Sequence, residues 1–236
     1  MLHKTKGIVL HHIKYGDTSI ICKILTQDKG LQSFIINGVR TTKSRMNNSL
    51  FQHLQPLDIV FYFKENRSLQ RIKEAYPNPV ITKIPNSISK STTAIFIAEI
   101  LYRSLPEDIF NEQIFEFVYG DILTLENSGN QNDFVFHFLL NLSEILGFQP
   151  QNEGKNKRYF DMREGVFCDS KPDYADIIEG PATSFLNALL QKESTLHFNE
   201  KVKNFLLNKL IEYYRIHLKD FQSIRSVALL NPEYFD

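Results

Sequence analysis

Cysteine is scarce in this sequence, with two thiols among 236 residues. Cys22 and Cys168 are too few for a disulfide scaffold or for a zinc site built from four cysteines. Long hydrophobic runs are also missing, because no stretch approaches the roughly 18 apolar residues that a membrane-spanning helix needs. The first nine residues show no signal-peptide pattern. We therefore expect a cytoplasmic protein that does not bind a membrane.

The common catalytic motifs are absent as well. The sequence holds no G-x-S-x-G, no Walker loop and no H-E-x-x-H, and its carboxylates are scattered. His11 and His12 are adjacent, and adjacent residues of a strand point to opposite faces, so the pair cannot easily bind one metal. We therefore expect a protein that is not an enzyme and that needs no cofactor.

The residues that are present are typical of a soluble globular protein, at 42% hydrophobic and 23% charged. The zero net charge hides a strong division. Residues 1–83 hold 13 Lys and Arg against 5 Asp and Glu, which is +8, and the remainder is −8. Two solvated faces of one protein would be the plainer explanation. We favour a basic head that meets phosphate and an acidic body with another role.

Five short runs rich in Ile, Val, Leu and aromatic residues precede residue 80, at 7–15, 18–26, 31–39, 57–64 and 68–76. Gly16-Asp17 between the first two is a hairpin signal. Five short strands predict a small closed barrel of the OB type, a Greek-key fold that commonly binds single-stranded nucleic acid or sugars. The predicted barrel core comprises Val9, Ile20, Ile21, Cys22, Ile24, Ile35, Ile36, Ile59 and Phe61.

Beyond the prolines at 77, 79 and 85 the hydrophobic period becomes helical. Helices are predicted over 87–105 and 111–125, from 132 or 133 to 146, and over 199–219. Ser89 or Ser91 starts the first, Asn132 or Asp133 caps the third, and Asn199 caps the last. The fold class is therefore an α+β multidomain protein. It has an OB-fold domain at 1–80 and a helical bundle domain at 81–236, with an irregular insertion near 149–181.

Basic residues gather in three places of the predicted barrel. Arg40, Lys43 and Arg45 lie in the loop before the fourth strand, where they can contact phosphates without reading bases, or serve only as a solubilising loop. Arg71 and Lys73 are two apart on the fifth strand and share a face, with Ile72 and Tyr76 on the other. Lys4, Lys6 and Lys14 have the same parity on the first strand. The predicted nucleic-acid-binding residues are Lys6, Lys14, Arg40, Lys43, Arg45, Arg71 and Lys73. Phe34, Tyr62 and Phe63 either stack on bases or fill the core.

Several short segments follow one another along the chain in a characteristic order and spacing. They are Gly7–Leu10, Tyr15–Asp17, Gly38–Arg40 with Lys43–Arg45, Leu54–Leu57, Leu146–Phe148 and Tyr159–Asp161. Together they resemble the RecO family of bacterial recombination mediators across most of the chain. Leu57 stands where that family has an aromatic residue. The resemblance implies an N-terminal OB-fold and a helical C-terminal domain.

The resemblance also implies a function. Members of the family bind single- and double-stranded DNA, anneal complementary strands and work with RecR. They contact the acidic C-terminal tail of single-stranded DNA-binding protein (SSB) so that RecA is loaded on SSB-coated DNA, which implies a bacterial, nucleoid-associated location. Many relatives carry a four-cysteine zinc motif, but only Cys168 remains here, so we expect no zinc. Arg103 and Arg158 are suggested for the basic edge of the tail pocket.

Two other functions fit the same residues. The first is an OB-fold module that binds RNA, and competition between DNA and RNA of equal length would separate it from a DNA-binding protein. The second is an interaction scaffold whose barrel binds a protein or a sugar. Such a scaffold should lack the steep salt dependence that phosphate contacts produce.

Overall fold

The computed structural model describes residues 1–39, 46, 48–107, 110–129, 133–151, 157–193 and 198–230. The chain divides into two compact units. The first comprises Met1–Asn130 together with Ala228–Leu230, and the second takes in Gln131–Val227. No helix in the described ranges is both long and apolar enough to cross a bilayer.

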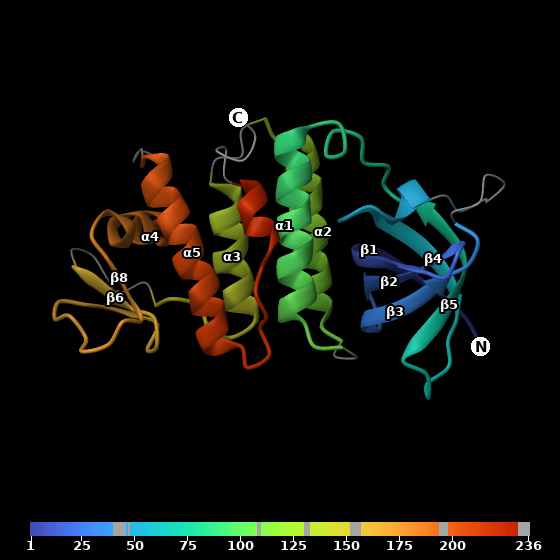
Figure 1. The fold of residues 1–236 in the computed structure, drawn as a ribbon, viewed down its shortest axis with the longest axis horizontal. Helices are drawn as coiled ribbons and strands as arrows, with labels where there is room; N and C mark the ends of the chain where they lie inside the picture. Colours follow the sequence, from blue (N-terminus) through green and yellow to red (C-terminus); the bar gives the residue numbers. More distant parts are fainter. Residues whose placement is uncertain are drawn as a thin grey trace. The chain divides into compact units, whose positions relative to one another are not determined.

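The first unit begins with a closed five-stranded barrel (Figure 1). Neighbouring strands pair in the order β1-β2-β3-β5-β4 and β1 also pairs with β4, so the sheet has no free edge. All pairs are antiparallel except β3 with β5. This arrangement confirms the predicted OB-fold barrel. The strands are β1 (Leu2–Tyr15), β2 (Ser19–Thr26), β3 (Gly30–Ile36), β4 (Pro56–Tyr62) and β5 (Leu69–Pro77), with a short 3-10 turn, η1 (Asn48–Phe51), before β4.

The barrel interior is filled by one apolar cluster. Most of the predicted core residues belong to this cluster. The prediction is wrong for Ile21 and Ile35, which pair with each other on the outer face of the barrel. Their neighbours Cys22 and Phe34 form the adjacent pair and point into the core. Gly7 sits where a Cβ would lie 2.6 Å from Cγ2 of Ile24, so the closely packed wall excludes any side chain there. The cluster comprises Val9, Ile20, Cys22, Ile24, Phe34, Ile36, Val39, Phe51, Leu57, Ile59, Phe61, Ile72 and Ala75.

Two β-bulges change which side chains face outward. In β1 the register with β2 shifts between Val9 and His11, so Leu10 is the extra residue. In β5 the register with β4 shifts where Val60 pairs with Glu74 but Phe61 pairs with Ile72, so Lys73 is extra. An extra residue reverses the in-and-out alternation of everything beyond it.

Two helices complete the first unit, α1 (Ile88–Ser104) and α2 (Glu112–Asn127). The predicted cap of α1 is wrong, because Ser87 is the N-cap and accepts a hydrogen bond from the Lys90 amide. The Ser91 hydroxyl instead donates to the Ile84 carbonyl at 2.7 Å. Asn111 caps α2 as the helical period predicts, accepting from the Ile114 amide at 3.3 Å. The change from strands to helices thus falls between Pro77 and Ile88.

The connection from the barrel to α1 is fastened by one buried carboxylate. Glu126, near the end of α2, is 9% exposed. It accepts from the backbone amides of Thr82 (2.9 Å), Lys83 (2.8 Å) and Ile84 (2.9 Å), and from the Thr82 hydroxyl. Burial acts to raise the pKa of Glu126, but these donors outweigh burial and the pKa is lowered.

The second unit combines three helices with a small sheet among its described residues. The helices are α3 (Phe134–Ile145), α4 (Pro181–Gln191) and α5 (Glu200–His217). A short 3-10 turn, η2 (Ser226–Leu230), follows in the chain, and its last three residues belong to the first unit. The sheet has the order β7-β6-β8 and is antiparallel throughout. Its strands are β6 (Tyr159–Asp161), β7 (Val166–Cys168) and β8 (Ile177–Glu179). The description of 149–181 as irregular is therefore wrong for residues 159–179, where the structure has these three strands, and α4 is an additional helix.

A group of polar contacts surrounds Asp161 in this small sheet. The Asp161 carboxylate accepts from the amides of Arg163 (2.9 Å) and Glu164 (3.2 Å), and the Tyr174 hydroxyl also donates to it. The Arg163 guanidinium donates to Asp176 at 2.6 Å and lies 4.1 Å from the Tyr174 ring centre. These contacts hold the β6–β7 turn against the loop that leads to β8.

Candidate nucleic-acid interface

A hollow of about 270 Å³ opens on the barrel wall where β4 and β5 pair. Its apolar part is formed by the buried Ile72 and the half-buried Met46, which packs against the barrel core. Its polar and aromatic part is exposed to water. The lining residues are Asn37, Met46, Tyr62, Arg71, Ile72 and Lys73.

Two cations stand at this hollow. Arg71 lies directly opposite Tyr62 in the β4–β5 register and points outward with it. Lys73 is the bulge residue, and its ammonium is 3.3 Å from Glu74 in an exposed pair that is worth little in water. The prediction that Arg71 and Lys73 share a surface is confirmed. The placement of Tyr76 on the opposite face is wrong, because the bulge turns it outward and leaves it 59% exposed.

The basic segment between β3 and β4 adjoins the same hollow in the sequence. Arg40, Lys43 and Arg45 lie outside the described residues. Asn37 and Met46, which flank the segment on either side, both line the hollow. Sequence reasoning missed these two residues, although their positions next to the basic segment were a usable signal. The role of the three cations stays a prediction.

The lysines of β1 do not form the stripe that their parity predicted. Lys6 is on the outer face, but beyond the bulge Lys14 pairs with Ile20, a core residue, and so belongs to the opposite face. The Lys6 ammonium lies 5.4 Å from the ring centre of Tyr119 on α2. Lys14 is exposed near the end of the strand. Neither lysine lines the hollow that holds Arg71 and Lys73.

Only one of the three candidate aromatic residues is open to a ligand in this hollow. Phe34 is fully buried in the barrel core and packs edge-on against Phe61. Phe63 is partly buried against the same core, with the Lys29 ammonium 5.0 Å from its ring centre. Tyr62 is 44% exposed and lines the hollow. A base can therefore reach Tyr62 but not Phe34.

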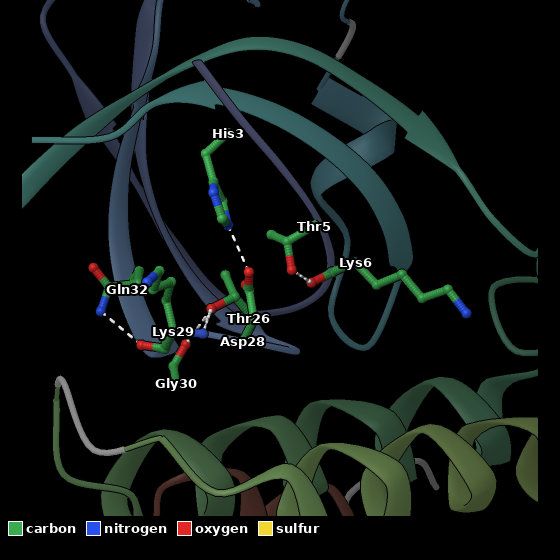
Figure 2. Close-up of polar contacts among 8 residues, drawn as sticks. All are labelled: His3, Thr5, Lys6, Thr26, Asp28, Lys29, Gly30 and Gln32. Carbon is green, nitrogen blue, oxygen red and sulfur yellow. Dashed lines mark hydrogen bonds and ion pairs between the residues drawn. The ribbon is translucent and has the colours of Figure 1, made fainter. Parts of the chain in front are cut away.

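The β2–β3 turn is held by a set of polar contacts (Figure 2). The Thr26 hydroxyl donates to the Gly30 carbonyl at 2.8 Å and accepts from the Lys29 amide at 3.1 Å. His3 on β1 reaches the Asp28 carboxylate at 2.6 Å. Figure 2 shows Lys6 extending away from this group. The turn is therefore fixed to β1 and holds Lys29 beside the Phe63 ring.

The histidines at the other end of β1 contact different partners. His11 stacks on Tyr102 of α1 with ring centres 4.9 Å apart, whereas His12 lies on the opposite face, 6.1 Å from His53. This confirms that the two do not point to one ligand. Burial lowers the pKa of both histidines. Burial also lowers the pKa of His53 to about 4; the charges of His12 and His11 lower it further, and the charge of Glu99 acts to raise it.

We expect the His53→Gln variant to lose less stability in acid than wild type. The folded-state pKa of His53 lies below the unfolded value of about 6.5. The unfolded chain therefore binds more protons from pH 6.5 down to about 4, and stability is lost as the pH falls through that window. With allowance for its partial exposure, His53 should account for about 2 kcal/mol of the loss.

Thermal unfolding at pH 7.5 and pH 4.5 tests this expectation. The drop in midpoint between the two pH values should be about 4–8 °C smaller in His53→Gln than in wild type. His137→Gln replaces an exposed histidine of α3 and should show the wild-type drop. Equal drops in all three proteins would show that His53 does not carry the acid sensitivity.

A zinc ion does not fit the second unit as it is described. Cys168 on β7 is half-buried, and burial raises the pKa of its thiol, which disfavours the thiolate that zinc requires. No group of three or more His, Cys, Asp or Glu that could hold a metal occurs in the described ranges. The polar contacts of Asp161, Tyr174 and Arg163 hold the sheet instead.

Comparison with known proteins covers almost the whole chain. Residues 1–78 match the family described as Recombination protein O N terminal, and residues 85–223 match Recombination protein O C terminal. A DNA repair protein RecO of Bacteroides fragilis is 35% identical over 100% of both chains. The protein of the same name from Azobacteroides pseudotrichonymphae is 32% identical over 99% of this chain and 100% of its own. That from Phocaeicola vulgatus is 33% identical over 98% of each.

The two family matches correspond to the strand-rich and the helix-rich parts of the chain. The N-terminal match spans the five-stranded barrel, and the C-terminal match begins shortly before α1 and ends beyond α5. Full-length identity above 30% to several curated relatives gives the same answer over both halves. This chain therefore belongs to the RecO family of bacterial DNA repair and recombination proteins.

Proposed function

We propose that this protein is a recombination mediator that binds single- and double-stranded DNA, anneals complementary strands and, with RecR, helps load RecA on SSB-coated DNA. The observation that carries the proposal is the pair Arg71 and Lys73, exposed on the barrel wall beside the hollow that Asn37 and Met46 border. These residues lie in the part of the chain with a charge of +8.

Charge neutralisation is the physical basis of the proposed activity. Two DNA strands repel each other through their phosphates, and Lys or Arg side chains that contact phosphates release condensed counterions and remove part of that repulsion. Phosphate contacts carry no sequence information, so the annealing should not depend on base sequence. This activity needs no catalytic residue, and we propose that the protein is not an enzyme.

The second unit is proposed to bind protein partners, RecR and the C-terminal tail of SSB among them. A hollow of about 380 Å³ between α3 and α4 supports peptide binding. The Phe185 and Phe198 rings pack 4.6 Å apart beside Leu189 to form its apolar part. His137 and Lys192 stand among its polar residues. A bacterial cytoplasmic, nucleoid-associated location follows from the proposed partners.

Strand annealing by the full-length protein tests the proposed function. The protein should speed the pairing of two complementary oligonucleotides by about tenfold or more at low salt, the lower end of electrostatic effects on association rates. The acceleration should fall steeply as salt is raised. RNA of equal length should compete less well than DNA. Absence of acceleration, or a flat salt dependence, contradicts the proposal, and stronger competition by RNA points to an RNA-binding module.

A further inference from the structure

We propose that Tyr62 is a stacking platform for one unpaired base, so that the hollow on β4 and β5 distinguishes single-stranded from double-stranded DNA. This inference rests on the proposed DNA binding and deepens it. Arg71 and Lys73 supply phosphate contacts that either form of DNA can make. Tyr62 supplies a contact that only a base outside a duplex can make.

The exposure of Tyr62 distinguishes it from the tyrosines that hold the fold together. Tyr213 and Tyr214 are 1% exposed, and their hydroxyls donate to the carbonyls of Phe148 and Leu139. Tyr62 is 44% exposed and sits on the outer face of β4, opposite Arg71 on one side and Leu2 on the other. Its ring is thus available on a rigid strand, where a ligand meets a fixed surface.

The chemistry around Tyr62 matches the parts of a nucleotide. The half-buried side chain of Met46 lines the same hollow as the ring, and the amide of Asn37 offers both a donor and an acceptor. The two cations stand at the same hollow. A base stacked on an aromatic ring next to basic side chains that follow the backbone is the general arrangement of single-strand binding surfaces.

The size of the hollow limits what it can hold. Its volume of about 270 Å³ lies just below the range of roughly 300–1,000 Å³ for pockets that enclose drug-sized ligands. One base fits, whereas a base pair inside a duplex is already stacked on both faces and cannot present a face to Tyr62. Every base has a π-face, so the preference concerns pairing and not sequence.

Anisotropy with a labelled dT oligonucleotide and a labelled blunt-ended duplex of two annealed strands, which has no unpaired loop, tests the inference in the full-length protein. The Tyr62→Leu variant should bind the single strand about fivefold or more weakly, the lower end of measured base–aromatic stacking. Its salt slope should equal that of wild type, and its affinity for the duplex should stay the same. Tyr62→Phe keeps the ring and should bind as wild type does. Tyr76→Leu is the matched control, because Tyr76 is an exposed tyrosine of β5 outside the hollow.

A second measurement uses the absence of tryptophan from the chain. Tyr62→Trp places the sole tryptophan in the hollow and keeps an aromatic ring on the strand. Its emission should be quenched by the single strand and not by the duplex, because a stacked base quenches indole fluorescence. Tyr76→Trp should be quenched by neither form of DNA.

The outcomes separate this inference from the proposed function. Suppose that wild type binds DNA, and that Tyr62→Leu lowers the affinity for single strand and duplex equally or lowers neither affinity. The stacking role is then wrong and the proposed function stands. Quenching of Tyr62→Trp by the duplex to the same degree has the same meaning. If wild type binds neither form of DNA, the proposed function itself fails.

Discussion

Replacing Glu126 by glutamine should lower the thermal midpoint of the first unit by roughly 6–12 °C. The carboxylate is 9% exposed and accepts from three successive backbone amides, at Thr82, Lys83 and Ile84. An amide side chain has one acceptor atom, so its NH2 group would face a backbone donor. Hydrogen bonds to a charged group contribute about 1.5–3 kcal/mol, and a buried donor left without an acceptor costs a similar amount. A loss of about 3 kcal/mol corresponds to the stated shift in a chain of this size.

Glu116→Gln is the matched control for this change. It lies on the same helix but is exposed, and its carboxylate accepts from the Gln27 side chain at 3.1 Å, which a glutamine oxygen can also do. Its free energy of unfolding should stay within about 0.5 kcal/mol of wild type, which is a midpoint shift of at most about 2 °C. Circular dichroism melts of the three proteins at pH 7.5 make the comparison. A Glu126→Gln midpoint equal to that of Glu116→Gln would show that the linker 78–87 does not depend on this carboxylate.

The fold could be predicted wherever local signals agreed with one another. Alternating apolar residues and the Gly16-Asp17 turn located the barrel strands, and Asn111 and Asn199 located two helix starts. The helix α4 was missed because its N-cap is Gly180 with φ 68°, and no side chain caps it. Strands of three residues, as in β6, β7 and β8, are too short to show a period of two.

The candidate site was predicted only in part, because strand pairing decides which side chains meet. Arg71 and Lys73 follow from spacing on one strand. The bulge at Leu10 depends on the pairing of β1 with β2, so a count along β1 alone placed Lys14 on the wrong face. Asn37 joins the hollow only because β3 lies beside β5, far from it in sequence. Contacts of this kind are set by the tertiary fold and are not visible in a local pattern.

Replacing Arg40, Lys43 and Arg45 together by alanine should flatten the salt dependence of single-strand binding by roughly two units. Each phosphate contact contributes about 0.7 to the slope for single strands. At about 0.1 M salt, two units correspond to a loss of roughly hundredfold in affinity, and the loss should be equal for all sequences. The expectation rests on three cations within six positions, in a segment whose neighbours Asn37 and Met46 line the hollow. Anisotropy titrations at several salt concentrations measure the slope.

A variant with the same change in net charge elsewhere separates phosphate contact from overall charge. Lys201, Arg215 and Lys219 are exposed residues of the second unit, and their replacement by alanine also removes three positive charges. This control should keep a slope close to that of wild type, because side chains that do not contact phosphates release few counterions. If the first variant is folded by circular dichroism and its slope is unchanged, the segment 40–45 is only a solvated surface. DNA binding would then depend on Lys6, Lys14, Arg71 and Lys73.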